Sequence, residues 1–144
     1  MIDEVRGNTY FNEPVAFDMD DGDIKETIRP YIMGRIVDIE KFFSHYHCDP
    51  LEKNVCISFE ITDHVLDWNN RTFNILFNEG NCSLTEQKAD CHVAMSIATL
   101  TALLLGYKTV LQLYRPERIQ GDEHSVQRLD DVILHETPYI SDYI

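Results

Sequence analysis

The sequence predicts an α+β domain in which a mainly antiparallel sheet carries helices packed on one face. Apolar and polar residues alternate along residues 55–62 and 73–77, as in strands with one buried face. Farther along, the apolar spacing lengthens to that of helices, and Gly106 and Pro116 stand where helices would end. The chain has 144 residues, of which 44% are apolar and 26% charged, so one packed core is expected.

Residues 1–27 are predicted to be an acidic arm, or a linker from a preceding domain. They carry eight acidic side chains against only Arg6 and Lys25, which is a poor composition for a core. Tyr10, Phe11 and Phe17 indicate that the arm lies against a surface, in this domain or in another one. Residues 28–144 are predicted to be the folded domain.

The first half of this domain reads as a strand, a helix and a three-stranded meander. We expect a strand over residues 32–37, then a helix over residues 39–46 with Asp38 as its N-cap and Pro50 beyond its end. The strands at 55–62 and 73–77 are followed by a turn at residues 79–81 and a weaker strand at 82–86. These three strands are expected to pair in antiparallel fashion.

The second half is predicted to be helical. After Asp90 the apolar residues at 93, 97, 100 and 104 share one helical face, and Gly106 closes that helix. A shorter helix at residues 110–114 stops at Pro116, and a last one is defined by Val126, Leu129 and Ile133 and ends near Thr137-Pro138.

The charge balance limits the partners. A net charge of -13 repels phosphate backbones and anionic lipid surfaces, so we expect neither a nucleic-acid nor a membrane partner. The four cysteines are widely spaced and are interpreted as small buried or half-buried side chains in a reducing compartment. No secretory signal is visible, and the longest apolar run is too short for a membrane span, so a cytoplasmic protein is expected.

Several polar residues have competing interpretations. The His45–Cys48 cluster has no second cluster to complete a metal site, so we predict a polar loop and no metal. Arg35 lies in an apolar segment and is expected to pair with Asp38 or Asp130. Trp68 is interpreted as lining a pocket or as anchoring a turn over the sheet.

Residues 29–43 read Arg-Pro-Tyr-Ile-Met-Gly-Arg-Ile-Val-Asp-Ile-Glu-Lys-Phe-Phe. This run resembles the opening of the C-terminal domain of acetyltransferases of the enhanced intracellular survival family, with Gly34 in place of the usual alanine. The resemblance continues through Asp67-Trp68-Asn69, Gly106-Tyr107 and Leu129-Asp130 to the end of the chain. It implies a sterol-carrier-protein-like fold for residues 28–144.

The resemblance also implies what surrounds this domain. Such proteins carry GNAT-type acetyltransferase domains earlier in the same polypeptide, and those domains bind acetyl-CoA. Here the six glycines are scattered, so no coenzyme-binding loop is visible and we expect no cofactor in this chain. The implied partners are the preceding GNAT domains, an amine-bearing small molecule or peptide, and further copies in a homo-oligomer.

In the resembling enzymes the chain-terminal carboxylate acts as general base on the acceptor amine. The implied catalytic group is the carboxylate of Ile144, although the family more often ends in an aromatic residue. Asp142, Tyr143 and Trp68 are the candidate substrate-binding residues. Asp142, and with it Glu136, Asp131 and Asp130, could attract the amine by their charge. The pKa of the terminal carboxyl would have to rise through burial and like-charge repulsion.

Two other functions stay open. The fold could open an apolar tunnel, which would make the chain a stand-alone lipid or sterol carrier. The domain could also serve only in oligomerisation. Under the acetyltransferase hypothesis, the isolated chain is expected to be inactive.

Overall fold

The computed structural model describes residues 11–12, 16–17, 24–25, 28–29 and 34–136. The four isolated pairs are short strands, which combine two by two. Strand β1 (Phe11–Asn12) pairs antiparallel with β4 (Ile28–Arg29), and β2 (Ala16–Phe17) pairs antiparallel with β3 (Ile24–Lys25). The division between an arm at 1–27 and a domain at 28–144 stays a prediction.

A five-stranded mixed sheet forms the centre of the described domain, in the order β7-β6-β5-β8-β9. Its strands are β5 (Val55–Thr62), β6 (Thr72–Asn78), β7 (Asn81–Leu84), β8 (Cys91–Ser96) and β9 (Ile119–Gln120). Strands β5, β6 and β7 form the predicted antiparallel meander. Strand β8 runs parallel to β5, and β9 pairs antiparallel with β8 at the edge.

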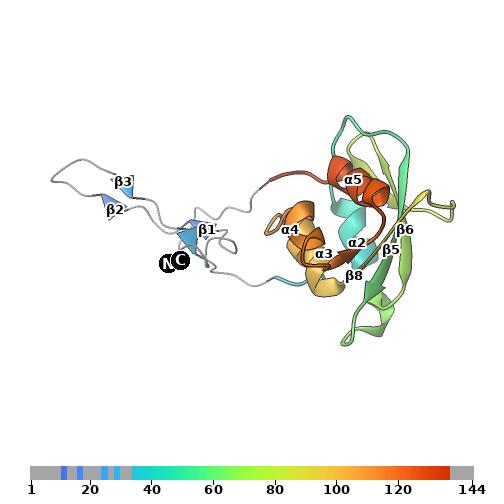
Figure 1. The fold of residues 1–144 in the computed structure, drawn as a ribbon, viewed down its shortest axis with the longest axis horizontal. Helices are drawn as coiled ribbons and strands as arrows, with labels where there is room; N and C mark the ends of the chain where they lie inside the picture. The colour runs from blue at the N-terminus through green and yellow to red at the C-terminus, as the bar shows by residue number, and fades with distance from the viewer. Residues whose placement is uncertain (1–10, 13–15, 18–23, 26–27, 30–33, 137–144) are drawn as a thin grey trace.

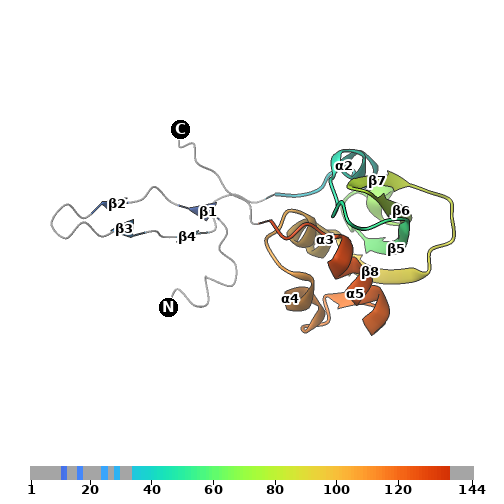
Figure 2. The same cartoon turned by 90° about the horizontal axis from the view of Figure 1, so that it is seen from above.

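The helices cover one face of this sheet, as predicted (Figures 1 and 2). The helical segments are α2 (Ile39–His45), the 3-10 turn η1 (Asp67–Asn69), α3 (Ile97–Leu104), α4 (Val110–Tyr114) and α5 (Glu123–Val132). No helix in the described part of the chain is long and apolar enough to cross a membrane.

The core lies between the sheet and the helices. Alternate residues of β5 point into it, and the ring of Phe59 lies 5.7 Å from that of Phe43 on α2. Phe77 of β6 completes this group, 6.2 Å from both rings, and all three side chains are fully buried. Offset and edge-to-face contacts between aromatic rings stabilise such a core beyond simple burial.

Several local signals are confirmed. Asp38 caps α2, because its side chain accepts a hydrogen bond from the main-chain N–H of Lys41. Gly106 follows α3 with a φ of +76°, a left-handed conformation that glycine adopts without steric cost. The four cysteines are free, three of them buried and one half-buried, in line with the prediction.

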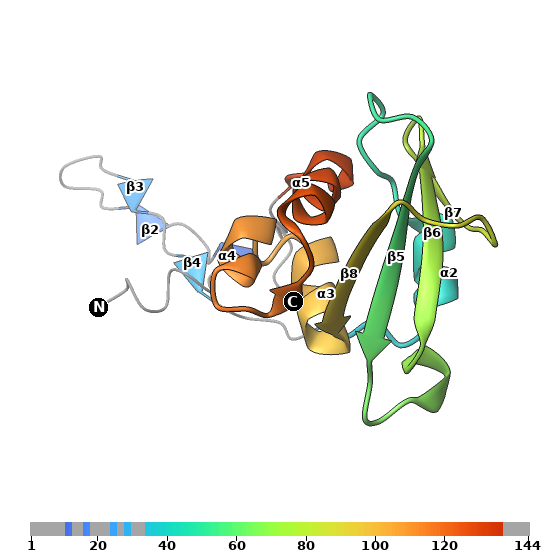
Figure 3. The ribbon, with the colours of Figure 1, turned by 45° about the vertical axis from the view of Figure 1, so that its right-hand side comes forward.

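The helix predicted after Asp90 is only partly right. Residues 91–96 are strand β8, and α3 begins at Ile97 (Figure 3). Cys91, Val93 and Met95 are buried while His92 is exposed, which is the two-residue period of a strand. The apolar residues at 93, 97, 100 and 104 matched a helical face only because a strand leads directly into a helix.

Two further expectations are wrong in detail. Residues 34–37 are not in a strand; the rest of the predicted strand, residues 32–33, lies outside the described residues. The main-chain N–H of Ile36 and the carbonyl of Val37 bond to side chains instead. The last helix ends at Val132, with Ile133 as its C-cap, and does not extend towards Thr137.

Candidate functional site

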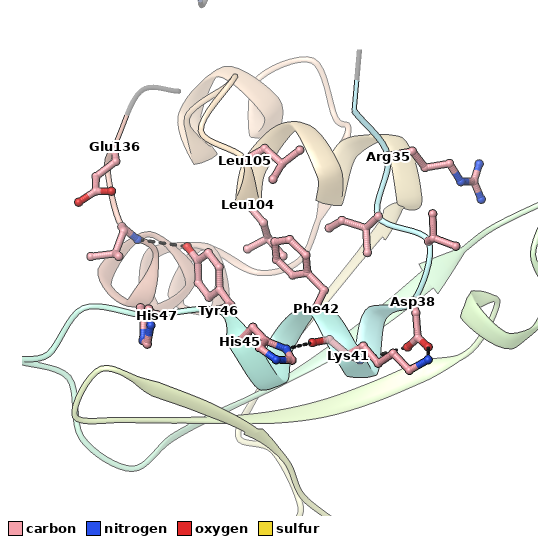
Figure 4. Close-up of a pocket in the computed structure, with 13 residues that line it drawn as sticks. Arg35, Asp38, Lys41, Phe42, His45, Tyr46, His47, Leu104, Leu105 and Glu136 are labelled. Atoms are coloured by element: carbon pink, nitrogen blue, oxygen red, sulfur yellow. Dashed lines mark hydrogen bonds and ion pairs between the residues drawn. The ribbon is translucent and has the colours of Figure 1, made fainter. Parts of the chain in front are cut away.

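A groove of about 840 Å³ opens between α2, the end of α3 and two flanking segments (Figure 4). We call residues 34–38 the leading segment and residues 133–136 the trailing segment. They lie on opposite sides of the groove, with Arg35 on one side and Glu136 on the other. The lining residues are Arg35, Ile36, Val37, Asp38, Lys41, Phe42, His45, Tyr46, His47, Leu104, Leu105, Leu134 and Glu136.

The leading segment is fixed by hydrogen bonds to side chains from two other elements. The main-chain N–H of Ile36 donates to Thr101 Oγ1 on α3 at 3.2 Å. The carbonyl of Val37 accepts two bonds of 2.9 Å, from Trp68 Nε1 and from Asn69 Nδ2 on η1. Because the main-chain N–H of Ile36 and the carbonyl of Val37 have side-chain partners, the leading segment does not need to pair with a neighbouring strand.

A buried carboxylate anchors this arrangement. Arg35 Nη2 donates to both oxygens of Asp63, at 2.7 and 2.5 Å, and the Asp63 side chain is fully buried. The main-chain N–H groups of Val65 and Leu66 and the Asn69 amide also donate to Asp63. Burial alone raises the pKa of Asp63, but these hydrogen bonds outweigh it and hold that pKa well below its usual range.

The partner predicted for Arg35 is therefore wrong. Neither Asp38 nor Asp130 pairs with it; the partner is Asp63. Asp38 instead caps α2 and lies 3.5 Å from Lys41 Nζ. Asp63 directly follows a strand, but its contact with Arg35 spans 28 residues, so no local pattern could reveal it.

The trailing segment is held by fewer contacts. The rings of Phe42 and Tyr46 stack with centroids 5.7 Å apart. The main-chain N–H of Leu134 donates to the Tyr46 hydroxyl at 3.4 Å, a long hydrogen bond. Burial raises the pKa of Tyr46 to about 12, so the hydroxyl stays neutral at physiological pH. Ile133, which begins the segment, is buried.

The predicted site residues are only partly covered by the structure. Ile144, Tyr143 and Asp142 lie outside the described residues, so their roles stay predictions. Trp68 does not line the groove. Its indole is 56% exposed and bonds to the carbonyl of Val37, which does line the groove.

The other polar candidates lie apart from one another. Of the acidic residues that could attract an amine, Glu136 lines the groove, and Asp131 pairs with Arg128 at 3.1 Å. His45 and His47 also line the groove, whereas Cys48 is buried. Within the described ranges, no three His, Cys, Asp or Glu side chains are arranged to hold a metal ion.

The N-termini of the four described α-helices are capped by side chains of the chain itself. A cradle for a coenzyme phosphate uses unpaired main-chain N–H groups at a helix N-terminus. The first turns of α2, α3, α4 and α5 are each capped by a side chain of their own, and those caps are Asp38, Ser96, Thr109 and Asp122.

The sequence profile of the sterol carrier protein domain matches residues 39–141. The chain belongs to the sterol carrier protein domain family. This result agrees with the mixed sheet and its one-sided helical layer. None of the curated proteins matches the chain.

Solved structures extend this assignment. The fold is similar to that of a conserved Enterococcus faecalis V583 protein of unknown function, described as a probable N-acyltransferase, with a TM-score of 0.75 and 30% identity. The match covers 92% of this chain and 35% of that one. A GCN5-related N-acetyltransferase from Anabaena variabilis matches with a TM-score of 0.65 and 22% identity, over 79% of this chain and 29% of that one.

Eis1 of Mycobacterium abscessus is also similar, with a TM-score of 0.55 and 16% identity over 82% of this chain and 27% of that one. At such identities, the Anabaena and Mycobacterium matches show the fold alone. In all three cases the chain spans about a third of the matched protein. The described domain thus corresponds to one part of longer chains.

Proposed function

We propose that this chain is the C-terminal domain of an acetyl-CoA-dependent N-acetyltransferase that acts on amines and belongs to the enhanced intracellular survival family. The observation that carries this proposal is the match to the Enterococcus faecalis protein, which covers nearly all of this chain but only 35% of that one. In the proposed enzyme a separate, preceding domain binds acetyl-CoA. The acceptor belongs to the aminoglycoside, lysine or polyamine type.

The proposed contribution of this domain is the carboxylate of Ile144. The described chain ends at Glu136, on the rim of the groove. Eight further residues reach at most about 28 Å when extended. Because Ile133 is buried and Leu134 is bonded to Tyr46, the start of this tail has a defined position. A terminal carboxylate within such a radius could enter a site on an adjoining domain.

The chemistry asked of this carboxylate is proton transfer. As the amine nitrogen attacks the acetyl carbon of the thioester, the carboxylate takes the proton that the nitrogen gives up, and the coenzyme sulfur leaves. A base works best when its pKa lies near the working pH, so the pKa of this carboxyl must be raised by burial and by negative neighbours such as Asp142. General base catalysis contributes about 10²- to 10⁴-fold to a rate.

The experiment is steady-state acetylation by the full-length polypeptide that carries this chain, with polyamines, lysine peptides and aminoglycosides as acceptors. Deletion of Tyr143 and Ile144 displaces the terminal carboxylate, and we expect kcat to fall about 100-fold or more. Ile144→Ala keeps the carboxylate in place and serves as the matched control, with kcat within a few fold of the parent. Equal kcat values in the deletion variant and the parent would refute the proposed base.

A lipid carrier is the second candidate, and the groove favours it. A volume of about 840 Å³ lies within the range of small-molecule sites, and Phe42, Leu104, Leu105 and Leu134 give it apolar walls. Native mass spectrometry of the purified chain separates the two functions. A carrier retains a fatty ligand through purification, whereas the proposed acetyltransferase domain gives only the mass of the polypeptide.

A further inference from the structure

Two of the four cysteines lie next to each other in the core. Cys48 follows α2, and Cys82 is on β7. His47 and Asn81 form an antiparallel bridge, and the main-chain N–H of Cys48 donates to the carbonyl of Gly80 at 3.1 Å. Successive side chains of extended segments point to opposite faces. The residues that follow His47 and Asn81 in the sequence, Cys48 and Cys82, therefore point to the same face.

The thiols of Cys48 and Cys82 are in contact. The Sγ atom of Cys48 lies 3.4 Å from the carbonyl oxygen of Asn81, the residue just before Cys82. Both cysteines are buried; burial raises the pKa of Cys82, and the contact with Cys48 raises it further. Burial also raises the pKa of Tyr46, and the negative charge of either thiolate would raise it further, so the phenol lies near both sulfurs. The two thiols and the phenol form one cluster.

The other two cysteines are placed differently. Cys91 on β8 is buried, and its Sγ atom faces Nδ1 of His124 at 3.7 Å. Cys56 directly precedes Ile57, the residue of β5 that pairs with Cys91. Since neighbours along a strand point to opposite faces, Cys56 and Cys91 lie on opposite faces of the sheet. A disulfide requires two β-carbons that approach closely and point towards each other. Among the four cysteines, Cys48 and Cys82 are the two that share a face and touch.

We propose that Cys48 and Cys82 are a redox-sensitive pair, which a hydroperoxide oxidises to a disulfide. In the first step the Cys48 sulfur forms a bond to oxygen as the O–O bond breaks, which gives a sulfenic acid and one water molecule. The Cys82 thiol then attacks this sulfur; the S–S bond forms, the S–O bond breaks and a second water leaves. The two thiols thus lose two electrons and two protons to the peroxide. Because the thiolate is the reactive form, the raised pKa of Cys82 assigns the first step to Cys48.

The position of the pair selects the oxidant and gives the disulfide a consequence. Both thiols are buried, so the substrate class is a small oxidant such as hydrogen peroxide, and larger thiol reagents should react slowly. Tyr46 and His47, just before Cys48, line the groove (Figure 4). The disulfide would therefore fasten this side of the groove to β7. In a reducing compartment such a bond is transient and suits redox sensing.

Peptide mapping of the complete 144-residue chain tests this pair. The reduced, folded chain is treated with hydrogen peroxide, the remaining thiols are alkylated in denaturant, and mass spectrometry identifies the linked peptides. We expect the Cys48–Cys82 link to exceed every other cysteine pairing by about tenfold or more, because disulfide geometry is restrictive. Cys48→Ser should lose this link. Cys56→Ser removes the half-buried cysteine outside the pair, and as the matched control it should keep the link.

Oxidation of the parent chain in urea shows whether the fold selects the pair, since the pairings should then be mixed. The proposal is overturned if Cys48 and Cys82 stay reduced in the folded chain, if they link to other cysteines or to a second copy, or if the folded and unfolded chains give the same mixture. The map of the parent decides this even where Cys48→Ser does not fold. Acetyl transfer is measured separately, so failure of the proposed function leaves this inference standing.

Discussion

The two walls of the groove differ in how they are held. The leading segment is bound to Thr101, Trp68 and Asn69, and its Arg35 pairs with a buried carboxylate. The trailing segment has one buried side chain, a hydrogen bond of 3.4 Å from Leu134 to Tyr46, and hydrogen bonds of Ile133 and His135 back to α5. The leading segment runs directly into α2.

The largest effect is expected on the leading segment, from Asp63→Ala. This change leaves Arg35 and several N–H donors without their acceptor in a buried place. Removing one partner of a buried ion pair costs about 3 to 5 kcal/mol. Because Arg35 is partly exposed, we expect Asp63→Ala to lower the free energy of unfolding by an amount at the lower end of this range. Unfolding in urea measures this loss. Asp67→Ala, at an exposed position of the same loop, should cost less than about 0.5 kcal/mol.

The two walls should also differ in their response to pH. The pKa of Asp63 is lower in the folded state, so its stabilisation is complete above the unfolded pKa of about 4 and is lost as the pH falls below that value. The pKa of Tyr46 is higher in the folded state, about 12 against 10.0. Its stabilisation is therefore complete below pH 10 and is lost as the pH rises towards 12.

Unfolding curves of the parent, Asp63→Ala and Tyr46→Phe across the pH range separate these two responses. The difference between the parent and Asp63→Ala should shrink only in acid, and the difference between the parent and Tyr46→Phe only in alkali. Matching pH profiles for the two differences would contradict the assignment.

A smaller effect is expected on the trailing segment. Tyr46→Phe removes the hydroxyl that accepts from Leu134 but keeps the ring stacked on Phe42. The loss of one neutral hydrogen bond costs about 1 kcal/mol. Amide hydrogen exchange should become faster at Leu134. It should stay unchanged at Ile36 in the leading segment, whose N–H donates to Thr101. Faster exchange at both amides would show that the walls are not independent.

The smallest effect is expected at Gly34, where the resembling family carries alanine. A Cβ at this position would lie 3.1 Å from Leu105 Cδ1, at the flexible end of a side chain that can move. The small steric cost is offset by the lower entropy of the unfolded chain. Gly34→Ala should change the free energy of unfolding by less than about 0.5 kcal/mol. A loss above 1 kcal/mol would mean that Leu105 is held more tightly than its surroundings suggest.

The fold was predictable where the signal was local. The alternation in β5 and β6 and the cap at Asp38 each depend on a few neighbouring residues. Strand β8 could not be recognised from the sequence, because Val93 in the strand and Ile97 in the following helix are spaced like residues on one helical face. Strand β8 pairs in parallel with β5, which lies far away in the sequence, and the spacing of apolar residues does not predict such a pairing.

The candidate site was less accessible from the sequence. The motifs around Arg35 and Trp68 were recognised separately, and the structure shows that they contact each other through Val37. The carboxylate that fixes them, Asp63, was missed because buried ion pairs leave no periodic signal. The residues proposed to act in catalysis, with Ile144 first, remain predictions from the resemblance.

The genomic reading frame shows whether this chain is one domain of an acetyltransferase. Sequencing upstream of the Met1 codon shows whether the frame stays open. If the chain is such a domain, we expect an open frame that encodes a strand, a glycine-containing coenzyme loop and a helix. A stop codon directly upstream, with no such domain encoded in frame, would contradict the claim and favour a free-standing carrier.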